Sequence, residues 1–254
     1  MTLFSGITLV TPVLRINNRE RNTEFYRKNL GFKVLKEENS QVFFGGHQEK
    51  LVRFSIEESP SMRVRAVEGP KKLASVIIKA EDPKEIESLL ASGVSFSHLF
   101  KGEKGYAYEI LSPENDVILL HAENDWTGLE EISREGLTFS SLPNFQGLSN
   151  FTIEQLILNV ADLPESQAFY KKLAGLDFLP DLQEAQGEDL KAAENTTWDL
   201  EFIEYHVPAD YDFLALKVYF EEAGLSVYLD RGQRVLVVSD PSQIELWFSK
   251  WKEY

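Results

Sequence analysis

Hydrophobic and polar positions along the chain repeat one order of elements, a strand followed by a helix and then by three short strands. Apolar, β-branched runs at residues 10–17 and 153–160 each lead into an amphipathic helix. The two helices end in similar sequences, FYRKNLGF at 25–32 and FYKKLAGLDF at 169–178. Copies separated by more than half of the chain predict two related halves.

Both repeated helices carry start and stop signals. Asn18 and Asp162 are good N-cap residues, and Glu165 follows Asp162 at the spacing of a capping box. Gly31 and Gly175 stand where a left-handed residue ends a helix. The aromatic pair in each copy lies on the turn that faces a sheet. We predict helices at 19–30, 83–91, 164–174 and 211–223.

Short alternating runs between turn residues predict the strands. The first half contains the βαβββ unit twice. The second half has a strand-poor, acidic stretch at 183–195, where one or two strands are missing or replaced. The predicted strands are 7–16, 32–38, 41–45, 51–57, 73–80, 95–99, 106–111, 117–122, 151–160, 176–182, 198–206, 225–229, 233–239 and 243–248.

These patterns predict an α+β fold of duplicated βαβββ units with a shortened C-terminal half. We expect an N-terminal domain of two units at 1–124, a linker at 125–150 and a shortened C-terminal domain at 151–254. The linker is rich in Gly, Pro and polar residues. We expect it to pack partly, through Trp126 and a short helix at 129–134.

Composition excludes several classes of protein. Among 254 residues, 26 Lys and Arg stand against 41 Asp and Glu, so the net charge of −15 disfavours nucleic-acid binding. The chain has no Cys, which excludes disulfides, thiolate metal sites and a Cys nucleophile. No apolar run approaches the ~18 residues of a membrane span. The first 15 residues lack a secretory pattern, so we expect a cytoplasmic protein, extracellular only by a route without a signal peptide.

The helix motif and two strand motifs together carry a resemblance. SPENDVILL at 112–120 and SDPSQIELWF at 239–248 each place a turn before the last strand of a unit. With FYxxxLGF they resemble the vicinal oxygen chelate superfamily, which includes glyoxalase I, bleomycin-resistance proteins and extradiol dioxygenases. The resemblance covers nearly the whole chain apart from the linker and 183–195. It implies paired units that curl into two half-open cradles, one of them N-terminal.

At a finer level, the two-part layout resembles the CppA family of Gram-positive bacteria, which joins a vicinal-oxygen-chelate-like domain to a shortened one. The family name implies a proteinase that degrades complement component three, and a host complement protein as partner. The residues show no H-E-x-x-H, G-x-S-x-G or Cys nucleophile. The sequence therefore names no catalytic residue and leaves open whether the chain is an enzyme.

Enzymes of the superfamily hold a divalent metal with a His or Gln on the first strand of a unit and a Glu on its last. In the first half, these positions fall on Thr11, Ser75 and Leu119. Hydroxyl and isobutyl groups do not replace imidazole or carboxylate ligands. We therefore expect the first half to lack this metal site. His121, on the same strand face as Leu119, is expected to be a packed or surface residue.

The second half keeps residue types that bind metals. The ligand positions fall on Gln155 and Glu245. His206 lies on the intervening strand, and Glu204 is a substitute for it on the same face. The resemblance thus implies a divalent metal held by Gln155, His206 and Glu245, with polar strand residues of no function as the alternative. We otherwise expect no cofactor.

Other side chains are candidates for binding a small molecule. Arg53 lies on a strand that would line the first cradle and would hold a carboxylate, or else lie in solvent. Tyr106 and Tyr108 would line an aromatic pocket or belong to the core. Trp247, Phe248 and Trp251 form a C-terminal aromatic cluster, which we expect to pack between the halves.

Three classes of function remain open. The first is a CppA-type protein, by name a proteinase. The second is a metal-independent module that binds a small molecule or a protein. The third is a metal-dependent lyase, isomerase or dioxygenase that uses the C-terminal half. The substitutions at Thr11, Ser75 and Leu119 favour the second class over the third.

Overall fold

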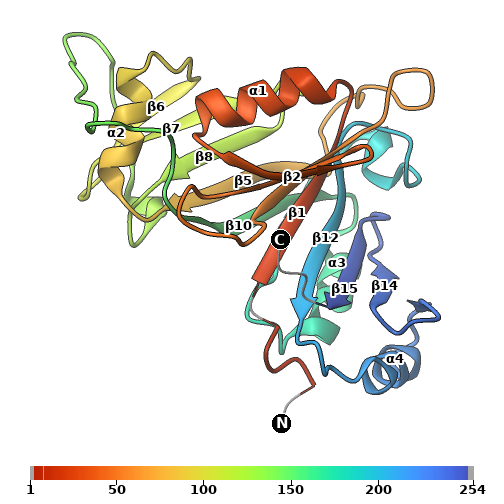
Figure 1. Ribbon diagram of the computed structural model, residues 1–254. Coiled ribbons are helices and arrows are strands. Elements are labelled where there is room, and N and C mark those ends of the chain that lie inside the picture. The colour runs from red at the N-terminus through yellow and green to blue at the C-terminus, as the bar shows by residue number, and fades with distance from the viewer. Residues whose placement is uncertain (1–2, 8, 251–254) are drawn as a thin grey trace.

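Two twisted β-sheets with four helices on their faces make up the molecule (Figure 1). The computed structural model describes residues 3–7 and 9–250. In these residues the helices are α1 (Arg19–Asn29), α2 (Pro83–Ala91), α3 (Leu163–Tyr170) and α4 (Phe213–Glu222). Three 3₁₀ turns are η1 (Trp126–Gly128), η2 (Lys171–Leu173) and η3 (Glu188–Lys191).

The strands form an eight-stranded sheet, ordered β13-β14-β15-β12-β1-β4-β3-β2, and a seven-stranded sheet, ordered β11-β10-β5-β8-β7-β6-β9. The α+β fold predicted from the sequence is confirmed. The strands are β1 (Leu9–Ile16), β2 (Lys33–Glu38), β3 (Gln41–Gly45), β4 (Phe54–Glu58), β5 (Leu73–Ala80), β6 (His98–Lys101), β7 (Tyr106–Leu111), β8 (Val117–His121), β9 (Glu130–Glu131), β10 (Phe151–Val160), β11 (Asp181–Glu184), β12 (Leu200–Val207), β13 (Tyr228–Leu229), β14 (Val235–Ser239) and β15 (Glu245–Lys250).

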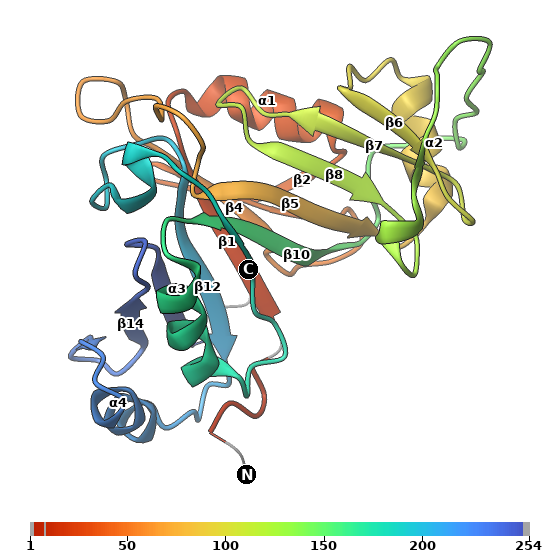
Figure 2. The same ribbon diagram turned by 180° about the vertical axis from the view of Figure 1, so that it is seen from behind.

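Each sheet combines one unit from each half of the chain. β1 pairs antiparallel with β12 in the larger sheet, and β5 pairs antiparallel with β10 in the smaller one, as Figure 2 shows from behind. We expected an N-terminal cradle built from the first two units, and this was wrong. The first strand of each unit has an edge of unpaired backbone groups. This edge forms hydrogen bonds with the first strand of a unit in the other half, and this pairing builds both sheets.

The helix signals are confirmed with one exception. Asn18 accepts a hydrogen bond from the amide of Arg21, and Asp162 accepts one from Glu165, as N-caps do. Gly31 ends α1 with a φ of 66°. Gly175 is not among the residues with positive φ, because α3 passes into the 3₁₀ turn η2 instead. A Cβ at Gly175 would lie 2.7 Å from the ring of Phe4, so close packing explains this glycine.

Two local predictions in the connecting segments were wrong. The expected helix at 129–134 is the turn η1 followed by β9, because the amide of Ile132 donates to the carbonyl of Leu99 and adds an edge strand to β6. The expected strand at 176–182 is replaced by β11, which begins at Asp181 and includes the first two residues of the acidic stretch at 183–195. The rest of the acidic stretch is not a strand, as expected. Its Asp189 binds Arg65 at 2.6 Å, which fixes it against the first half.

Aromatic side chains join the two sheets in one continuous core. Phe32 stacks on Phe151 of β10, with ring centroids 4.1 Å apart and planes at 4°. Tyr26 of α1, fully buried, packs on Phe54 of β4 with centroids 4.8 Å apart. Its counterpart Tyr170 is also buried. The repeated motif therefore directs a tyrosine into the core, as its position predicts. None of the described helices has both the length and the apolar character needed to cross a membrane.

The stack between Phe32 and Phe151 leads to a test of the core. Phe151→Ala removes the buried ring of β10 that stacks on Phe32, and we expect the free energy of unfolding to fall by about 3–5 kcal/mol. Urea unfolding at equilibrium measures it. Met62 is almost fully exposed, so Met62→Ala is the control, with an expected change within about 0.5 kcal/mol. A loss below 1 kcal/mol in Phe151→Ala would contradict this role.

Candidate functional site

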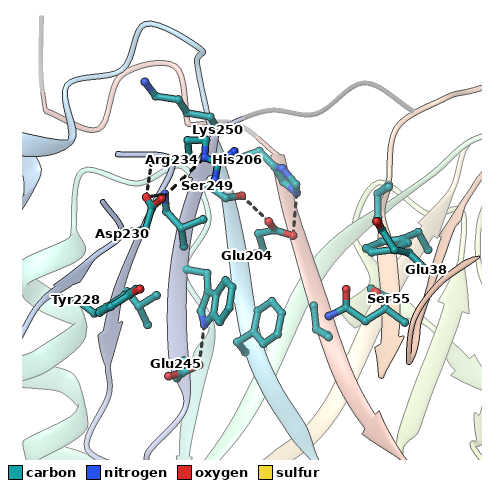
Figure 3. Close-up of a pocket in the computed structure, with 18 residues that line it drawn as sticks. Glu38, Ser55, Glu204, His206, Tyr228, Asp230, Arg234, Glu245, Ser249 and Lys250 are labelled. Atoms are coloured by element: carbon teal, nitrogen blue, oxygen red, sulfur yellow. Dashed lines mark hydrogen bonds and ion pairs between the residues drawn. The ribbon is translucent and has the colours of Figure 1, made fainter. Parts of the chain in front are cut away.

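The open face of the eight-stranded sheet carries a cavity of about 790 Å³, which we call the main cradle (Figure 3). It spans strands of both terminal units, from β3 and β4 across β1 and β12 to β13, β14 and β15. Its floor is therefore made only when residues near the two ends of the chain come together. The lining residues are Val13, Glu38, Gln41, Phe43, Val52, Ser55, Phe202, Glu204, His206, Tyr228, Asp230, Arg234, Val235, Val237, Glu245, Trp247, Ser249 and Lys250.

Strand register places the floor residues in rows across the central strands. Ser55 of β4 lies opposite Val13 of β1, which lies opposite Phe202 of β12, which lies opposite Glu245 of β15. Directly opposed residues on neighbouring strands point to the same face of a sheet. This row therefore contains a single carboxylate, beside one hydroxyl and two apolar side chains.

A polar group occupies the neighbouring rows. Thr11 lies opposite Glu204, and its hydroxyl donates to the carbonyl of Val52 at 3.0 Å. His206 Nε2 lies 3.0 Å from the same hydroxyl, so Nε2 carries the hydrogen and donates it. The carboxylate of Glu204 lies 3.8 Å from Nε2 and accepts a hydrogen bond from Ser249. The contacts of Glu204 appear as dashed lines in Figure 3.

Aromatic side chains form the centre of the floor. Trp247 stacks on Phe202, with ring centroids 4.4 Å apart and planes at 17°. The indole Nε1 donates to Glu245 at 2.7 Å, which fixes the orientation of the ring. Phe248 points to the opposite face and stacks on Tyr205 in the core. The predicted aromatic cluster is thus divided by strand alternation, and its third member, Trp251, lies outside the described residues.

An acidic group lines a separate small pocket, which shares Glu245 with the main cradle. A register shift in the pairing of β1 with β12 brings Glu201 to Arg15, whose guanidinium also donates to Asn195. Burial raises the pKa of Glu201 to about 7, although Arg15 opposes this increase. Burial, together with the neighbouring carboxyl of Glu194, raises the pKa of Glu245. The sequence did not indicate this group, because its members are far apart along the chain. The register shift between β1 and β12 and the loop that contains Asn195 bring them to Glu245 of β15.

The structure brings Glu204, His206 and Glu245 into the main cradle but not Gln155. Gln155 lies on β10 in the other sheet, where its side-chain amide donates to the carbonyl of Leu179 at 3.2 Å. In that sheet it lies opposite Ile77, which lies opposite Leu119. Apolar residues thus separate Gln155 from any further donor in its own row.

The ligand-binding candidates do not share a cavity with one another. Arg53 binds Glu49 at 3.0 Å beside the main cradle. Tyr106 lies beneath the ammonium of Lys101, 4.0 Å from the ring centroid, on the other sheet. Tyr108 is fully buried, and its hydroxyl donates to the carbonyl of Asn29. Tyr108 is therefore a core residue that links β7 to α1.

His121 was expected to be either packed in the protein or on its surface, and it is fully buried. Its Nδ1 accepts from the amide of Glu123 at 3.1 Å, and its Nε2 lies 2.6 Å from a carboxylate oxygen of Glu154. Burial lowers the pKa of His121, which Glu154 opposes. Lys79 lies 3.3 Å from the other oxygen of Glu154. The pair occupies the smaller sheet and has no contact with the main cradle.

The donors of the main cradle do not fit the metal centre that the fold implies. That centre needs imidazole, amide or carboxylate groups on the first and last strands of the paired units. Here the row of Glu245 continues with Phe202, Val13 and Ser55, and His206 donates through Nε2 to Thr11. Among residues 3–7 and 9–250, no three His, Asp or Glu side chains form a group that could hold a metal ion.

Comparisons with known proteins agree with this fold. The family model described as CppA N-terminal matches residues 9–132, and the model described as CppA C-terminal matches residues 148–248. The crystal structure of the CppA protein from Streptococcus pneumoniae TIGR4 is 36% identical, with a TM-score of 0.86. The match covers 97% of this chain and 100% of that one.

More distant relatives share the architecture. Glyoxalase I from Zea mays is 15% identical with a TM-score of 0.54, over 96% of this chain and 92% of that chain. The vicinal oxygen chelate fold inferred from the sequence is therefore confirmed. Catechol-2,3-dioxygenase of Bacillus subtilis (strain 168) is 28% identical over 191 residues, 65% of this chain. The chain spans 64% of the length of that dioxygenase.

The raised pKa of Glu201 leads to a pH-dependent prediction. The folded pKa, about 7, exceeds the ordinary 4.5, so folding favours the protonated acid. The contribution of Glu201 to the stability of the folded chain is fully present below pH 4.5 and is lost as the pH rises through 7. We expect the free energy of unfolding to fall through this group between about pH 5 and pH 8, and the fall to be smaller in Glu201→Gln.

Urea unfolding at both pH values measures the change. Glu201→Gln also leaves Arg15 without its charged partner, so the difference between the two pH values, rather than absolute stability, carries the test. The exposed Glu135 offers a control, since Glu135→Gln should keep the wild-type dependence. If the free energy of unfolding changes equally with pH in Glu201→Gln and in wild type, the raised pKa of Glu201 is refuted.

The donor set of the main cradle leads to a second prediction. After treatment with a chelator, addition of Mn²⁺, Fe²⁺, Ni²⁺ or Zn²⁺ should leave the melting temperature unchanged. A metal at ~100 times its Kd would stabilise the folded chain by ~2.7 kcal/mol, which a melting curve detects. Glu245→Ala is the matched variant. A shift with one metal that disappears in Glu245→Ala would show a metal site that includes this carboxylate.

Proposed function

The chain belongs to the CppA family, and we propose that it is a ligand-binding protein. Its main cradle holds a small organic molecule without a metal centre. The observation that carries this proposal is the composition of the cradle floor. An aromatic pair lies at its centre, and a few oriented polar groups surround it. Small-molecule sites have this character, with apolar walls and a small number of placed polar side chains.

The size and rigidity of the main cradle support binding. Its volume of about 790 Å³ lies within the ~300–1,000 Å³ typical of small-molecule sites. Its floor consists of strands, and hydrogen bonds to Glu245 and Ser249 hold the indole of Trp247 and the carboxylate of Glu204 in place. A site with fixed side chains loses little conformational entropy when a ligand binds.

A metal-dependent reaction has weaker support. The names glyoxalase I and catechol-2,3-dioxygenase belong to the relatives that carry them. In this chain, Thr11 occupies the first-strand ligand position, and the row of Glu245 continues with Phe202 and Val13. Apolar side chains do not coordinate a divalent cation. The lyase, isomerase and dioxygenase alternatives are therefore less well supported than binding.

Proteolysis also lacks support from the side chains of the main cradle. A hydroxyl nucleophile needs a base that accepts its proton. Thr11 is fully buried and donates its hydrogen to a backbone carbonyl. Ser249 donates to Glu204 rather than to His206. Complement component three as a substrate or partner therefore stays a prediction taken from the family name.

Thermal-shift screening of small organic molecules against the full chain tests the proposal. We expect some compounds to raise the melting temperature, and the shift to be lost in Trp247→Ala, which removes the central wall. Phe139 packs on Tyr106 over the other sheet, so Phe139→Ala is an aromatic control that should keep the shift. The proposal fails if no compound stabilises the protein, or if the same compounds stabilise Trp247→Ala equally.

A further inference from the structure

We propose that the main cradle selects organic cations, namely apolar molecules that carry an ammonium, guanidinium or amidinium group. The inference rests on the proposed function and names the ligand class of that same site. It follows from the charges of the cradle floor, from the position of those charges beside the aromatic pair, and from the contacts that the nearby cations already make.

Two carboxylates on the floor form no salt bridge with a Lys or Arg among the described residues. Glu204 accepts from Ser249, and the imidazole of His206 lies 3.8 Å from it. Glu245 accepts from the indole of Trp247, and its other charged neighbours are Glu194 and, beyond salt-bridge distance, Arg15. Across the described ranges 3–7 and 9–250, neither carboxylate lies within 4.0 Å of a Lys or Arg nitrogen. Both side chains are half-buried, so their charges are only partly solvated.

The cations that line the main cradle are directed elsewhere. The guanidinium of Arg234 is 77% exposed and lies 3.9 Å from Asp230 at the rim. The ammonium of Lys250 lies over the ring of Phe213, 5.7 Å from its centroid. A third acid, Glu38, is bound to Lys36 at 2.6 Å. Neither Arg234 nor Lys250 therefore forms a salt bridge with Glu204 or Glu245.

Those two carboxylates lie on either side of the aromatic pair. Glu204 is opposite Trp247, and Glu245 is opposite Phe202, so the acids are diagonal neighbours on two adjacent strands. Diagonal neighbours have Cα atoms about 7–8 Å apart. Figure 3 shows Glu204 beside His206 and Ser249, and Glu245 lower on the floor, apart from Glu204. A cation bound there would meet a carboxylate and an aromatic surface, which both attract positive charge.

Other ligand charges fit less well. An anion would meet two carboxylates in a partly desolvated cavity, where repulsion is stronger than in water. A neutral apolar molecule would remove water from Glu204 and Glu245 without replacing its hydrogen bonds, which is costly. The net charge of −15 adds a long-range field that attracts cations to the chain.

Three probes with one ring system and different charges test the inference. Isothermal titration calorimetry with the full chain would compare naphthalene-2-carboxamidine, the neutral 2-naphthamide and the anionic 2-naphthoate. We expect the amidine to bind at least tenfold more tightly than the naphthoate, with the amide between them. We also expect the affinity of the amidine, and not that of the amide, to fall as salt is raised.

Matched variants locate the effect. Glu204→Gln and Glu245→Gln should each weaken amidine binding about threefold to tenfold and leave the amide within twofold. Glu135→Gln is the control, because Glu135 is exposed and does not line the main cradle. It should change amidine affinity by less than twofold. Melting curves of every variant establish that it is folded before its affinity is compared.

The outcomes separate this inference from the proposed function. If the amide or the naphthoate binds as tightly as the amidine, or if both Gln variants bind the amidine like wild type, selection of cations is overturned while the main cradle remains a binding site. If none of the three probes binds and the screen finds no other ligand, both proposals fail. Selective amidine binding that Glu204→Gln and Glu245→Gln weaken supports both.

Discussion

The antiparallel pairing of β1 with β12 is the contact on which the rest of the structure depends. It joins two segments that lie almost 200 residues apart, such as Leu9 and His206. Each row of the main cradle crosses this pair of strands. A slip of one residue would turn every cradle side chain into the core, and a slip of two would separate Thr11 from Glu204. Register thus decides which side chains meet.

The same pairing explains why the chemistry of this site differs from the metal-binding pattern of the vicinal oxygen chelate superfamily, whose fold the chain shares. Register places Phe202 and Val13 in the row of Glu245, while the first-strand ligand position of the metal-binding pattern falls on Thr11. It also places Trp247 beside Glu204, so a carboxylate and an indole share the next row. The side chains of these two rows give the floor an aromatic centre, while backbone pairing holds the strands in register.

Signals within a short stretch of sequence predicted much of the fold. Caps at Asn18 and Asp162 and the left-handed Gly31 depend on neighbours within a turn, so composition reveals them. The central strands β5 and β10 were predicted at their observed bounds, because buried strands carry continuous apolar runs. For Gly175, local propensity misled, since contact with the distant Phe4 explains this glycine.

The site was harder to predict, because its residues are selected by pairing between halves. Glu204 and His206 were placed on one face by alternation alone, and Glu245 by its strand motif. Gln155 had the right residue type but belongs to the other sheet. Glu201 and Arg15 meet only through a register shift, which no local pattern reports. The sequence thus predicted which residue types could form a site, but not which of them lie next to one another in the fold.

One consequence concerns the synthesis of the chain on the ribosome. The strands β12 and β15 emerge long after β1, since the partners Leu9 and His206 are 197 residues apart (206 − 9). At about 5–20 residues per second, β1 waits roughly 10–40 s for its partner. During this time its free edge is open to other chains. An early, incorrect association of nascent chains is therefore the characteristic hazard of an architecture that divides each sheet between both halves.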